Sequence, residues 1–496
     1  MRFLLENEKL IPEQLSDKPG AKRITDFETG YLQPLNPTFN YSSELQHLLH
    51  GKQLLLEEIP FSLEVIHHHY LNGYLQYRKC IAKTKDGYDC VRCGNSNQKL
   101  FASFGCARCK NECAYCRKCI NMGRMSECTV LVSWTGPSPK VGILGKPLAW
   151  EGMLSPGQQR ASTGLMKAVQ EDDQLLIWAV CGAGKTEILF EGIETALQAG
   201  KKVCLATPRT DVVIELAPRI KSAFPGIDVI ALYGGSEDRN KTAPITLATT
   251  HQLLRYYKSF DMIIIDEVDA FPYSVEPMLQ YAVNQSKKEI SSTIYLTATP
   301  NQTWKNEIAA GKRKAVTIPA RYHRYALPVP ELRWCGNWEK ILKKKRLPRN
   351  VMAWIKEHLE IGKQAFLFVP RITYLESIVA ILQSLDPRIE GVHAEDPNRK
   401  DKVARFRSGE IPILVTTTIL ERGVTVPNID VAVLGAEDKI FTESALVQIS
   451  GRVGRSAQFP TGEILFFHYG KTREMIKAKQ HIEKMNKEAS QNGFID

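Results

Sequence analysis

The chain has 496 residues, of which 43% are hydrophobic and 24% charged, so it can form about three globular domains with sizeable cores. No segment approaches the roughly 20 apolar residues of a membrane-spanning helix, and the early acids Glu6 and Glu8 argue against a secretory signal. The net charge of +11 favours polyanionic partners only mildly. We therefore expect a cytoplasmic protein whose thiols stay reduced.

Residues 1–60 show little periodicity and are expected to form a partly irregular extension. A helix is predicted to begin near residue 61, in a segment that contains three consecutive histidines, His67–His69. Consecutive helical residues point in different directions, so these histidines are not expected to share one metal ion.

Nine of the twelve cysteines lie between Cys80 and Cys128, which indicates a metal site rather than disulfides in a reducing compartment. Zinc prefers four such ligands, often as two C-x₂-C pairs. Cys90 and Cys93, followed by a glycine, form the best first pair. The spacing does not choose the second pair and leaves two sites open. The competing second pairs are Cys106 with Cys109, Cys113 with Cys116, and Cys116 with Cys119.

Basic residues stand between these cysteines and suit either phosphate contacts or a solvated surface. They are Arg92, Arg108, Arg117 and Lys118. We predict a zinc-binding module at 61–133, followed by a linker rich in Gly and Pro at 134–150.

Short apolar runs alternate with amphipathic stretches beyond the linker, the pattern of buried parallel sheets between helices. The expected strands are 175–180, 203–207, 245–250, 262–266 and 293–299, and then 364–369, 391–394, 412–417, 431–435 and 463–468. We predict an α/β fold with two tandem domains, at 151–333 and 334–496. The charged helix at 471–490 is expected to be largely solvated.

The strand at 175–180 runs into a phosphate-binding loop that Ala179 opens. Glycines in this loop let backbone N–H groups turn toward phosphate oxygens. Lys185 is expected to reach the β- and γ-phosphates, and Thr186 to hold Mg²⁺. The residues expected to surround ATP are Ala179, Cys181, Gly182, Ala183, Gly184, Lys185 and Thr186.

Two further motifs carry groups that hydrolysis needs. Asp266 ends an apolar strand and is expected to hold Mg²⁺ through water, while Glu267 orients and deprotonates the attacking water. Arg452 and Arg455, in the segment QISGRVGR, can supply positive charge to the γ-phosphate from the second domain.

These motifs resemble those of superfamily 2 helicases and translocases, in the order of that family. The resemblance implies two RecA-like domains and places Gln158 at the adenine. Departures are Thr425, where many relatives carry Asp, and Gln448, where RNA-type helicases commonly carry His; the latter favours the DNA-acting branch. The DNA contacts that the resemblance implies are Pro208, Arg209, Thr250, His251, Thr417 and Arg422.

A cysteine-bearing segment before WAVCGAGKTE, IIDEVDAFPY and FTESALVQISGRVGR resembles the bacterial late-competence helicase family ComFA. That resemblance implies four zinc ligands, with Cys106, Cys109 and Cys113 as extras. The implied ligands are Cys90, Cys93, Cys116 and Cys119.

The same resemblance implies an ATPase with ATP, Mg²⁺ and Zn²⁺ as cofactors, at the inner face of the cell membrane, which drives or assists uptake of single-stranded DNA. It also implies ComFC-like and DprA-like partners, peripheral association with the uptake channel, and an oligomer as one option. Two alternatives stay open: a DNA helicase of the replication-restart or recombination type, and a zinc-containing protein that binds nucleic acid without hydrolysis.

Overall fold

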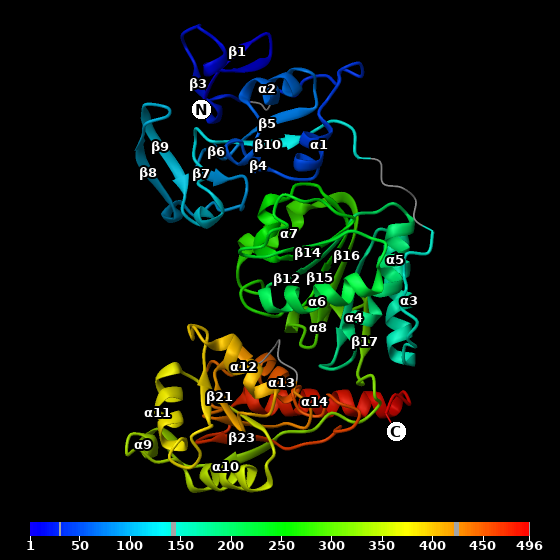
Figure 1. Cartoon of the computed structure of the whole chain (residues 1–496), viewed down its shortest axis with the longest axis vertical. Coiled ribbons are helices and arrows are strands. Elements are labelled where there is room, and N and C mark those ends of the chain that lie inside the picture. The colour runs from blue at the N-terminus through cyan, green and yellow to red at the C-terminus, as the bar shows by residue number, and fades with distance from the viewer. Residues whose placement is uncertain (29–30, 140–144, 421–425, 496) are drawn as a thin grey trace. The chain divides into compact units, whose positions relative to one another are not determined.

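The computed structural model describes residues 1–28, 31–139, 145–420 and 426–495 (Figure 1). The chain divides into two compact units. One comprises Met1–Glu151, Met166–Gln174 and Phe190–Tyr295, and the other Gly152–Leu165, Leu175–Leu189 and Leu296–Asp496. Among the described helices, none combines the length and apolarity needed to cross a bilayer.

The N-terminal part of the first unit contains two small antiparallel sheets. Strands β1 (Arg2–Glu6), β2 (Lys9–Pro12) and β3 (Lys22–Arg23) form the first, in the order β2-β1-β3. The second has the order β4-β10-β5, with β4 at Leu54–Leu55, β5 at Leu75–Lys79 and β10 at Val130–Trp134. The boundary expected at residue 60 therefore runs through one sheet, and the segment expected as partly irregular contains strands.

Helix α1 (Ser43–Leu49) and helix α2 (Leu63–Leu71) pack in this part. Helix α2 confirms the predicted helix, and the Ser62 side chain caps it by accepting a hydrogen bond from the Val65 N–H. His69 accepts a hydrogen bond from the Ser42 N–H through Nε2, and burial lowers the pKa of His67 to about 4. These two histidines are buried packing residues.

Two β-hairpins carry most of the clustered cysteines. The first joins β6 (Ile81–Thr84) to β7 (Gly87–Cys90), and the second joins β8 (Phe101–Cys106) to β9 (Asn111–Cys116). In the second hairpin, Phe104 pairs with Cys113 and Phe101 with Cys116.

The first α/β domain has a seven-stranded sheet in the order β13-β14-β12-β15-β16-β11-β17. All five strands predicted here are confirmed, because their apolar runs are buried on both faces. The shorter strands β13 and β17 were not predicted. The strands are β11 (Gln174–Ala179), β12 (Val203–Thr207), β13 (Val229–Leu232), β14 (Ile245–Thr249), β15 (Phe260–Ile265), β16 (Lys287–Thr297) and β17 (Ala315–Ile318). The helices are α3 (Pro156–Gln170), α4 (Lys185–Ile188), α5 (Phe190–Gln198), α6 (Thr210–Ala223), α7 (Pro277–Ser286) and α8 (Gln302–Ala309), with a 3₁₀ segment η6 (Thr250–Arg255).

The second α/β domain has a six-stranded parallel sheet in the order β18-β23-β22-β19-β21-β20. The five predicted strands are again confirmed, and β18 is additional. The strands are β18 (Glu331–Trp334), β19 (Ala365–Phe368), β20 (Glu390–Val392), β21 (Ile413–Thr416), β22 (Asp430–Leu434) and β23 (Ile464–His468). The helices are α9 (Trp338–Leu342), α10 (Arg349–Ile361), α11 (Ile372–Leu382), α12 (Arg399–Arg407), α13 (Glu443–Ser450) and α14 (Arg473–Gln491).

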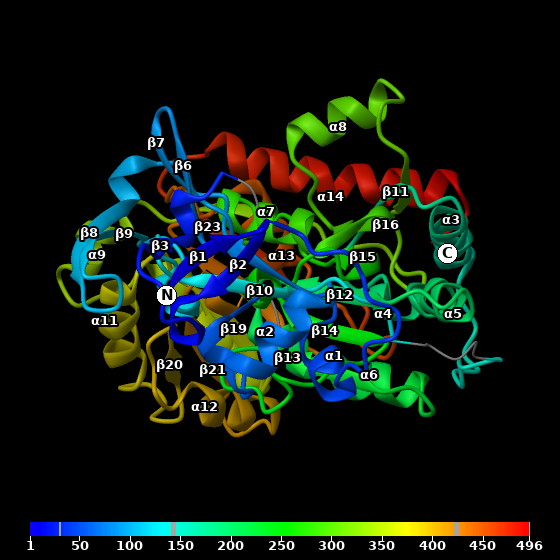
Figure 2. The same ribbon diagram turned by 90° about the horizontal axis from the view of Figure 1, so that it is seen from above.

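The long helix α14 (Figure 2) is not the solvated helix that its charge indicated. One side of it is buried, with apolar residues spaced three or four apart, as on the core-facing side of an amphipathic helix. The buried residues are Met475, Ala478, His481, Ile482, Met485 and Ala489. The expected exposure to solvent is therefore wrong for this buried side of the helix. It is confirmed for the charged residues on the opposite side.

Candidate functional site

The loop predicted to bind phosphate directly follows β11, and its backbone shape depends on two glycines. Gly182 and Gly184 have φ values of 83° and 71°, in the left-handed region that favours glycine. A Cβ atom at Gly184 would lie 2.4 Å from Nε2 of Gln158. Helix α4 begins at Lys185 directly after this turn. The loop therefore has the tight path that lets its amides face a phosphate group.

Gln158 lies in α3 and is 4% exposed. Its Nε2 donates a hydrogen bond of 2.8 Å to the carbonyl of Ala183, and its Oε1 accepts one of 2.8 Å from the Ser155 N–H. Gln158 thus fixes the phosphate-binding loop directly. The adenine contact expected of it stays a prediction.

The acidic pair follows β15 in the first unit. The Asp266 N–H donates a hydrogen bond of 2.8 Å to the carbonyl of Ala206, on the neighbouring strand, and the Glu267 N–H donates one of 2.8 Å to Asp266 Oδ1. Glu267 has a φ of 54°, which is uncommon for a residue other than glycine and clusters at functional sites. The backbone thus holds the Asp266–Glu267 turn in a defined and strained shape.

The segment with the two predicted arginines follows α13 in the second unit and approaches the phosphate-binding loop. Cys181 Sγ donates a hydrogen bond of 3.0 Å to Gln448 Oε1. A Cβ atom at Gly451 would lie 2.4 Å from the Cβ of Cys181, so only glycine permits this approach. Arg452 is 2% exposed, and Arg455 Nε donates a hydrogen bond of 2.7 Å to the carbonyl of Gly451.

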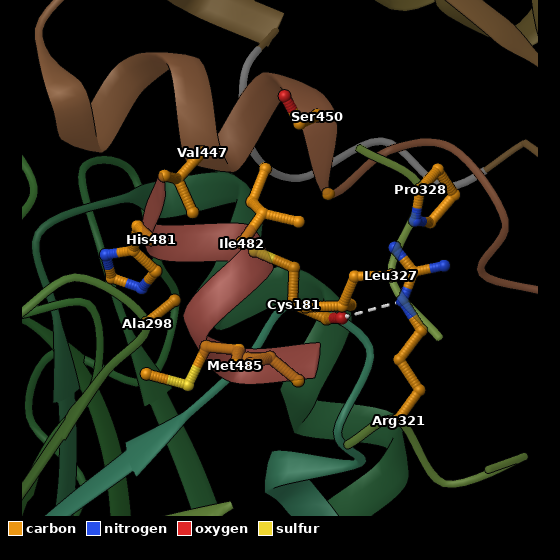
Figure 3. A pocket seen from close by; sticks show the side chains of 12 residues that line it. Cys181, Ala298, Arg321, Leu327, Pro328, Val447, Ser450, His481, Ile482 and Met485 are labelled. Atoms are coloured by element: carbon orange, nitrogen blue, oxygen red, sulfur yellow. Dashed lines mark hydrogen bonds between the residues drawn. The ribbon is translucent and has the colours of Figure 1, made fainter. Parts of the chain in front are cut away.

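Arg321 is a site residue that the sequence did not reveal (Figure 3). It is 1% exposed, and its Nε donates a hydrogen bond of 3.2 Å to the carbonyl of Cys181. Its Nη1 donates to the carbonyl of Gly454, so one guanidinium joins the phosphate-binding loop to the arginine-bearing loop. Burial, together with the charge of Arg455, lowers the pKa of Arg321 to about 10. No motif spacing marks this residue, since it stands in basic sequence after β17, near the end of the first predicted domain.

A small cavity lies beside this bridge, also shown in Figure 3. Its volume of about 20 Å³ suffices for a water molecule and not for a nucleotide. Its lining includes Cys181, Arg321, Val447, His481 and Met485. Side chains of α13 and α14 therefore pack directly against the end of β11.

The predicted DNA contacts are distributed over both units. Arg209 directly precedes α6, and its guanidinium forms a salt bridge of 2.8 Å with Asp211. Pro208 precedes it, directly after β12.

Thr250 and His251 begin η6, but Thr250 is fully buried, which leaves its side chain no exposed surface for nucleic acid in this structure. Thr417 follows β21 and is partly buried. Arg422 lies outside the described residues, as does Thr425.

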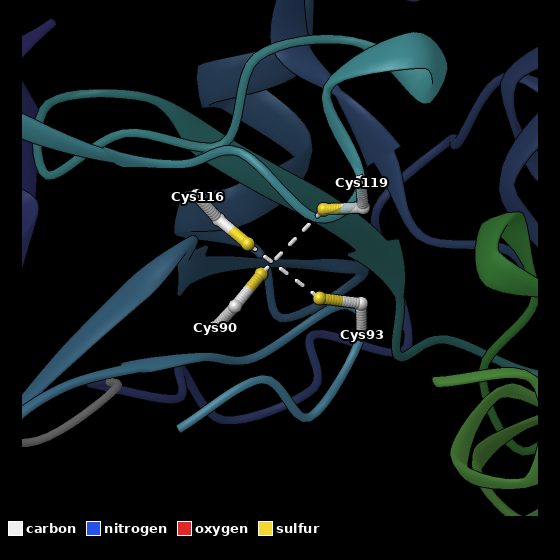
Figure 4. A group of neighbouring side chains, drawn as sticks. All are labelled: Cys90, Cys93, Cys116 and Cys119. Atoms are coloured by element: carbon white, nitrogen blue, oxygen red, sulfur yellow. Dashed lines mark hydrogen bonds between the residues drawn. The ribbon is translucent and has the colours of Figure 1, made fainter. Parts of the chain in front are cut away.

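The four cysteines implied as zinc ligands converge (Figure 4). All are buried, and their sulfur atoms lie within 4.8 Å of one another. The Sγ atoms of Cys90 and Cys119 are 3.7 Å apart, as are those of Cys93 and Cys116. Tetrahedral Zn²⁺ with Zn–S bonds of about 2.3 Å requires sulfur separations of roughly 3.8 Å. The four sulfurs therefore fit zinc.

Arg92, between two of these ligands, does not face a phosphate. It is 2% exposed, and its guanidinium donates hydrogen bonds to the carbonyls of Cys119, Met122 and Gly123. Its Nη2 also lies 3.3 Å from Cys119 Sγ. The phosphate contact considered for Arg92 is wrong. The residue instead places a buried positive charge beside a cysteine cluster, which offsets the negative charge of four thiolates.

A second cluster contains the cysteines expected as extras, together with Cys128. Its four buried sulfur atoms also lie within 4.8 Å of one another. Its members are Cys106, Cys109, Cys113 and Cys128. Hydrogen bonding from Cys113 lowers the pKa of Cys128 to about 4, and hydrogen bonding from Cys116 holds the pKa of Cys119 well below its usual range. Each cluster thus contains a cysteine that favours the thiolate, the form that binds metal, while hydrogen bonding with neighbouring thiols raises the pKa of Cys90 and Cys113.

The first cluster is fastened to the first α/β domain within the same compact unit. The carbonyl of Val91 accepts hydrogen bonds of 3.0 Å from the Tyr281 hydroxyl and from Gln285 Nε2, both on α7. Lys118 forms a salt bridge of 2.6 Å with Glu276, which precedes the same helix. The turn between Cys90 and Cys93 therefore contacts the helicase-type domain directly.

Three protein-family models match successive parts of the chain. Residues 36–133 match the "Competence protein ComFA N-terminal domain", residues 151–302 the "Type III restriction enzyme, res subunit", and residues 344–457 the "Helicase conserved C-terminal domain". A solved structure of the DEAD-box helicase Mss116, bound to ssRNA and UDP-BeF, aligns with a TM-score of 0.51 at 18% identity, over 66% of this chain and 73% of that one. That likeness shows the fold alone.

Two competence proteins are similar to the chain over most of its length. The chain is 49% identical to competence protein ComFA of Bacillus subtilis over 457 residues, which span 92% of this chain and 98% of the relative. It is 41% identical to competence protein ComFA of Streptococcus pneumoniae over 76% of this chain and 86% of the relative. A weaker match is the ATP-dependent DNA helicase RecG of Streptococcus pneumoniae, at 24% identity over 61% of this chain and 47% of that one. The chain belongs to the ComFA family of competence proteins, with a cysteine-bearing N-terminal domain before two helicase-type domains.

Proposed function

We propose that this protein is an ATP-driven motor on single-stranded DNA that drives or assists uptake of transforming DNA. Its helicase domains imply ATPase activity. The observation that carries the proposal is the approach of the two loops in the second unit. Cys181 of the phosphate-binding loop contacts Gln448, and Arg321 bridges Cys181 to Gly454. A motor needs this proximity, because its second domain must respond to the γ-phosphate.

Each motif has a distinct role in hydrolysis under this proposal. Lys185 and the loop amides hold the phosphates, and Gln158 keeps the loop in shape through Ala183. Thr186 and Asp266 would hold Mg²⁺, which supplies charge neutralisation at the phosphates. Glu267 orients the attacking water and accepts its proton.

Arg452 and Arg455 stabilise the charge that develops on the γ-phosphate, a contribution of about 10³–10⁵ in rate where it has been measured. Loss of the γ-phosphate removes their partner, so that hydrolysis changes the contact between the loops.

We infer the DNA substrate and the cellular role from the family to which the chain belongs. Both closer relatives are named competence proteins, and the weaker one is named a DNA helicase. We infer that single-stranded DNA crosses the surface beside the partly exposed Arg209 and the exposed Thr210, since Pro208 is itself buried, and that the protein works on the cytoplasmic side of the membrane. ComFC-like and DprA-like proteins and an uptake channel are its proposed partners.

Zinc at the cluster of Cys90, Cys93, Cys116 and Cys119 is proposed to be structural. The cluster is closed, since all four positions of a tetrahedral ion are taken by cysteine, and no place remains for a substrate. Arg92 stabilises this centre by charge.

Steady-state ATPase assays test the nucleic-acid assignment. Activity is measured without nucleic acid and then with single-stranded DNA, duplex DNA and RNA of equal length. We expect strong stimulation by single-stranded DNA. Equal stimulation by RNA, or a preference for forked duplex, would replace the proposal with a general helicase of the replication-restart type.

The variant Lys185→Ala tests the motor assignment. It removes the only side-chain charge of the phosphate-binding loop, so we expect ATP turnover to fall by at least about a hundredfold. Binding of single-stranded DNA, measured by fluorescence anisotropy, should change little. Lys167→Ala, an exposed lysine of α3 in a surface pair with Glu171, is the matched control. Normal turnover by Lys185→Ala would contradict the motor.

A further inference from the structure

The second cysteine cluster is formed by a short hairpin and one returning segment. Cys106 ends β8, Cys109 lies in the turn, and Cys113 lies on β9. The Lys110 N–H donates a hydrogen bond of 2.8 Å to the carbonyl of Cys106, and Lys110 has a φ of 54°. Such a tight turn brings the two sulfurs of a C-x₂-C pair to one point.

Cys128 completes the cluster from outside the hairpin. Its Sγ lies 3.5 Å from that of Cys106, close to the roughly 3.8 Å that tetrahedral zinc requires and far beyond the length of a disulfide bond. The position of Cys128 is fixed on both sides. The Glu127 N–H donates a hydrogen bond of 3.0 Å to the carbonyl of Ala114, and the Thr129 hydroxyl donates one of 2.9 Å to the carbonyl of Ser126.

An ordinary apolar core does not explain this cluster. Within the described part of the chain, its buried core consists of the four cysteines alone, with Phe104 packed partly against them. A two-stranded hairpin is marginally stable in water without more support than that. A metal ion supplies the missing stabilisation in small domains whose cores are too small.

We propose that Cys106, Cys109, Cys113 and Cys128 bind a second zinc ion, independent of the one proposed at Cys90, Cys93, Cys116 and Cys119. Four thiolates that are close enough to coordinate one ion tetrahedrally favour Zn²⁺ over hard cations such as Mg²⁺ and Ca²⁺. The two ligand sets share no residue and alternate along the chain. Strand β9 contributes one ligand to each centre, Cys113 and Cys116, so both ions hold the same hairpin.

The two proposed zinc centres lie beside different surfaces of the module. The first contacts α7 through Val91, as described above. The second forms one wall of an open cavity of about 560 Å³, in which Cys106 and Cys128 lie beside Arg108 and Arg124. The second ion therefore fixes the tip of the hairpin with the exposed Arg108, while the first fixes the module to the motor domain.

Zinc stoichiometry of the full chain tests this proposal. Purified protein is dialysed against metal-free buffer, and zinc per polypeptide is measured by inductively coupled plasma mass spectrometry. We expect two zinc ions in the unaltered protein. Cys113→Ser with Cys128→Ser should retain one, Cys90→Ser with Cys93→Ser should retain one, and the combination of all four changes should retain none. Cys335→Ser, a buried cysteine of the second α/β domain, is the control and should retain two.

A second measurement keeps the test decisive if a variant folds poorly. The unaltered protein is loaded with Co²⁺, and the absorption of tetrahedral thiolate-bound cobalt is followed during titration. Saturation at two equivalents supports two centres. One zinc ion in the unaltered protein, saturation at one equivalent of cobalt, or an unchanged zinc content in Cys113→Ser with Cys128→Ser would overturn the proposal.

Discussion

The buried guanidinium of Arg321 connects two loops that hydrolysis must coordinate. Replacing it with glutamine removes the charge and the link between the carbonyls of Cys181 and Gly454, although Gly454 keeps its contact of 3.0 Å with His323 Nε2. We expect kcat for ATP to fall by about tenfold, because the two loops are no longer held in a fixed position relative to each other. KM should change less. Arg321→Lys should recover part of the rate, since it keeps the charge and one donor.

The control for Arg321 is Arg333→Gln, an arginine that pairs with Glu331 on β18. Thermal unfolding of each variant is measured beside its kinetics. A variant Arg321→Gln with unaltered kcat and only a lower melting temperature would show that the bridge is structural.

Single residues were predictable where their chemistry depends on near neighbours in sequence. The glycines of the phosphate-binding loop and the pair Cys90 and Cys93 follow from local turn geometry. Arg92 and Arg321 were not predictable, because a buried arginine has the same sequence signature as an exposed one. Their roles arise from carbonyl groups that only the folded chain brings within reach.

Helices α13 and α14 are joined by an ion pair whose effect on stability depends on pH. His481 and Lys305 contact the Glu443 carboxylate at 3.1 and 3.0 Å. The hydrogen bond from His481 lowers the pKa of Glu443 from 4.5 to about 2. A lowered folded-state pKa stabilises the fold above the unfolded pKa, and this stabilisation is lost as the pH falls from about 4.5 to about 2.

We expect Glu443→Gln to reduce the free energy of unfolding by roughly 2–3 kcal/mol at pH 7, and by much less near pH 3. Urea titrations at both pH values measure the difference. Glu376→Gln, at an exposed position of α11, is the control and should show no such pH dependence. An equal loss at both pH values would mean that packing, and not the ion pair, joins the helices.

Elements were predictable where the chain has long uniform patterns. Continuous apolar runs identified the central strands of both sheets, which are buried on both faces. Short strands such as β13 and β18 lie at the ends of their sheets, where that pattern is weak. The spacing of the cysteines left a second site open but did not identify its four members, since Cys128 has no nearby cysteine partner and joins the others only through the fold.

At the scale of the molecule, the N-terminal module and a large part of the first α/β domain, including Phe190–Tyr295, form one compact unit joined by buried polar contacts. Gln53, at 1% exposure, is central to this junction. Its Nε2 donates hydrogen bonds to the carbonyl of Leu254 at 3.2 Å and to Gln285 Oε1 at 2.6 Å. Its Oε1 accepts one of 2.9 Å from Arg78. Leu254 belongs to η6 and Gln285 to α7, so one side chain links the module to two elements of the motor domain.

Replacing Gln53 with leucine keeps the size of the side chain but leaves its buried partners unsatisfied. We expect the free energy of unfolding to fall by roughly 2–3 kcal/mol and the linker at 134–150 to be cleaved faster in limited proteolysis, because the module separates more often. Zinc content should stay unchanged, since both cysteine clusters lie within the module. The control is Gln98→Leu, whose hydrogen bonds to Tyr88 stay inside the module. Unaltered cleavage in Gln53→Leu would show that apolar packing alone holds the module, whereas loss of zinc would show that the junction and the metal centres fold together.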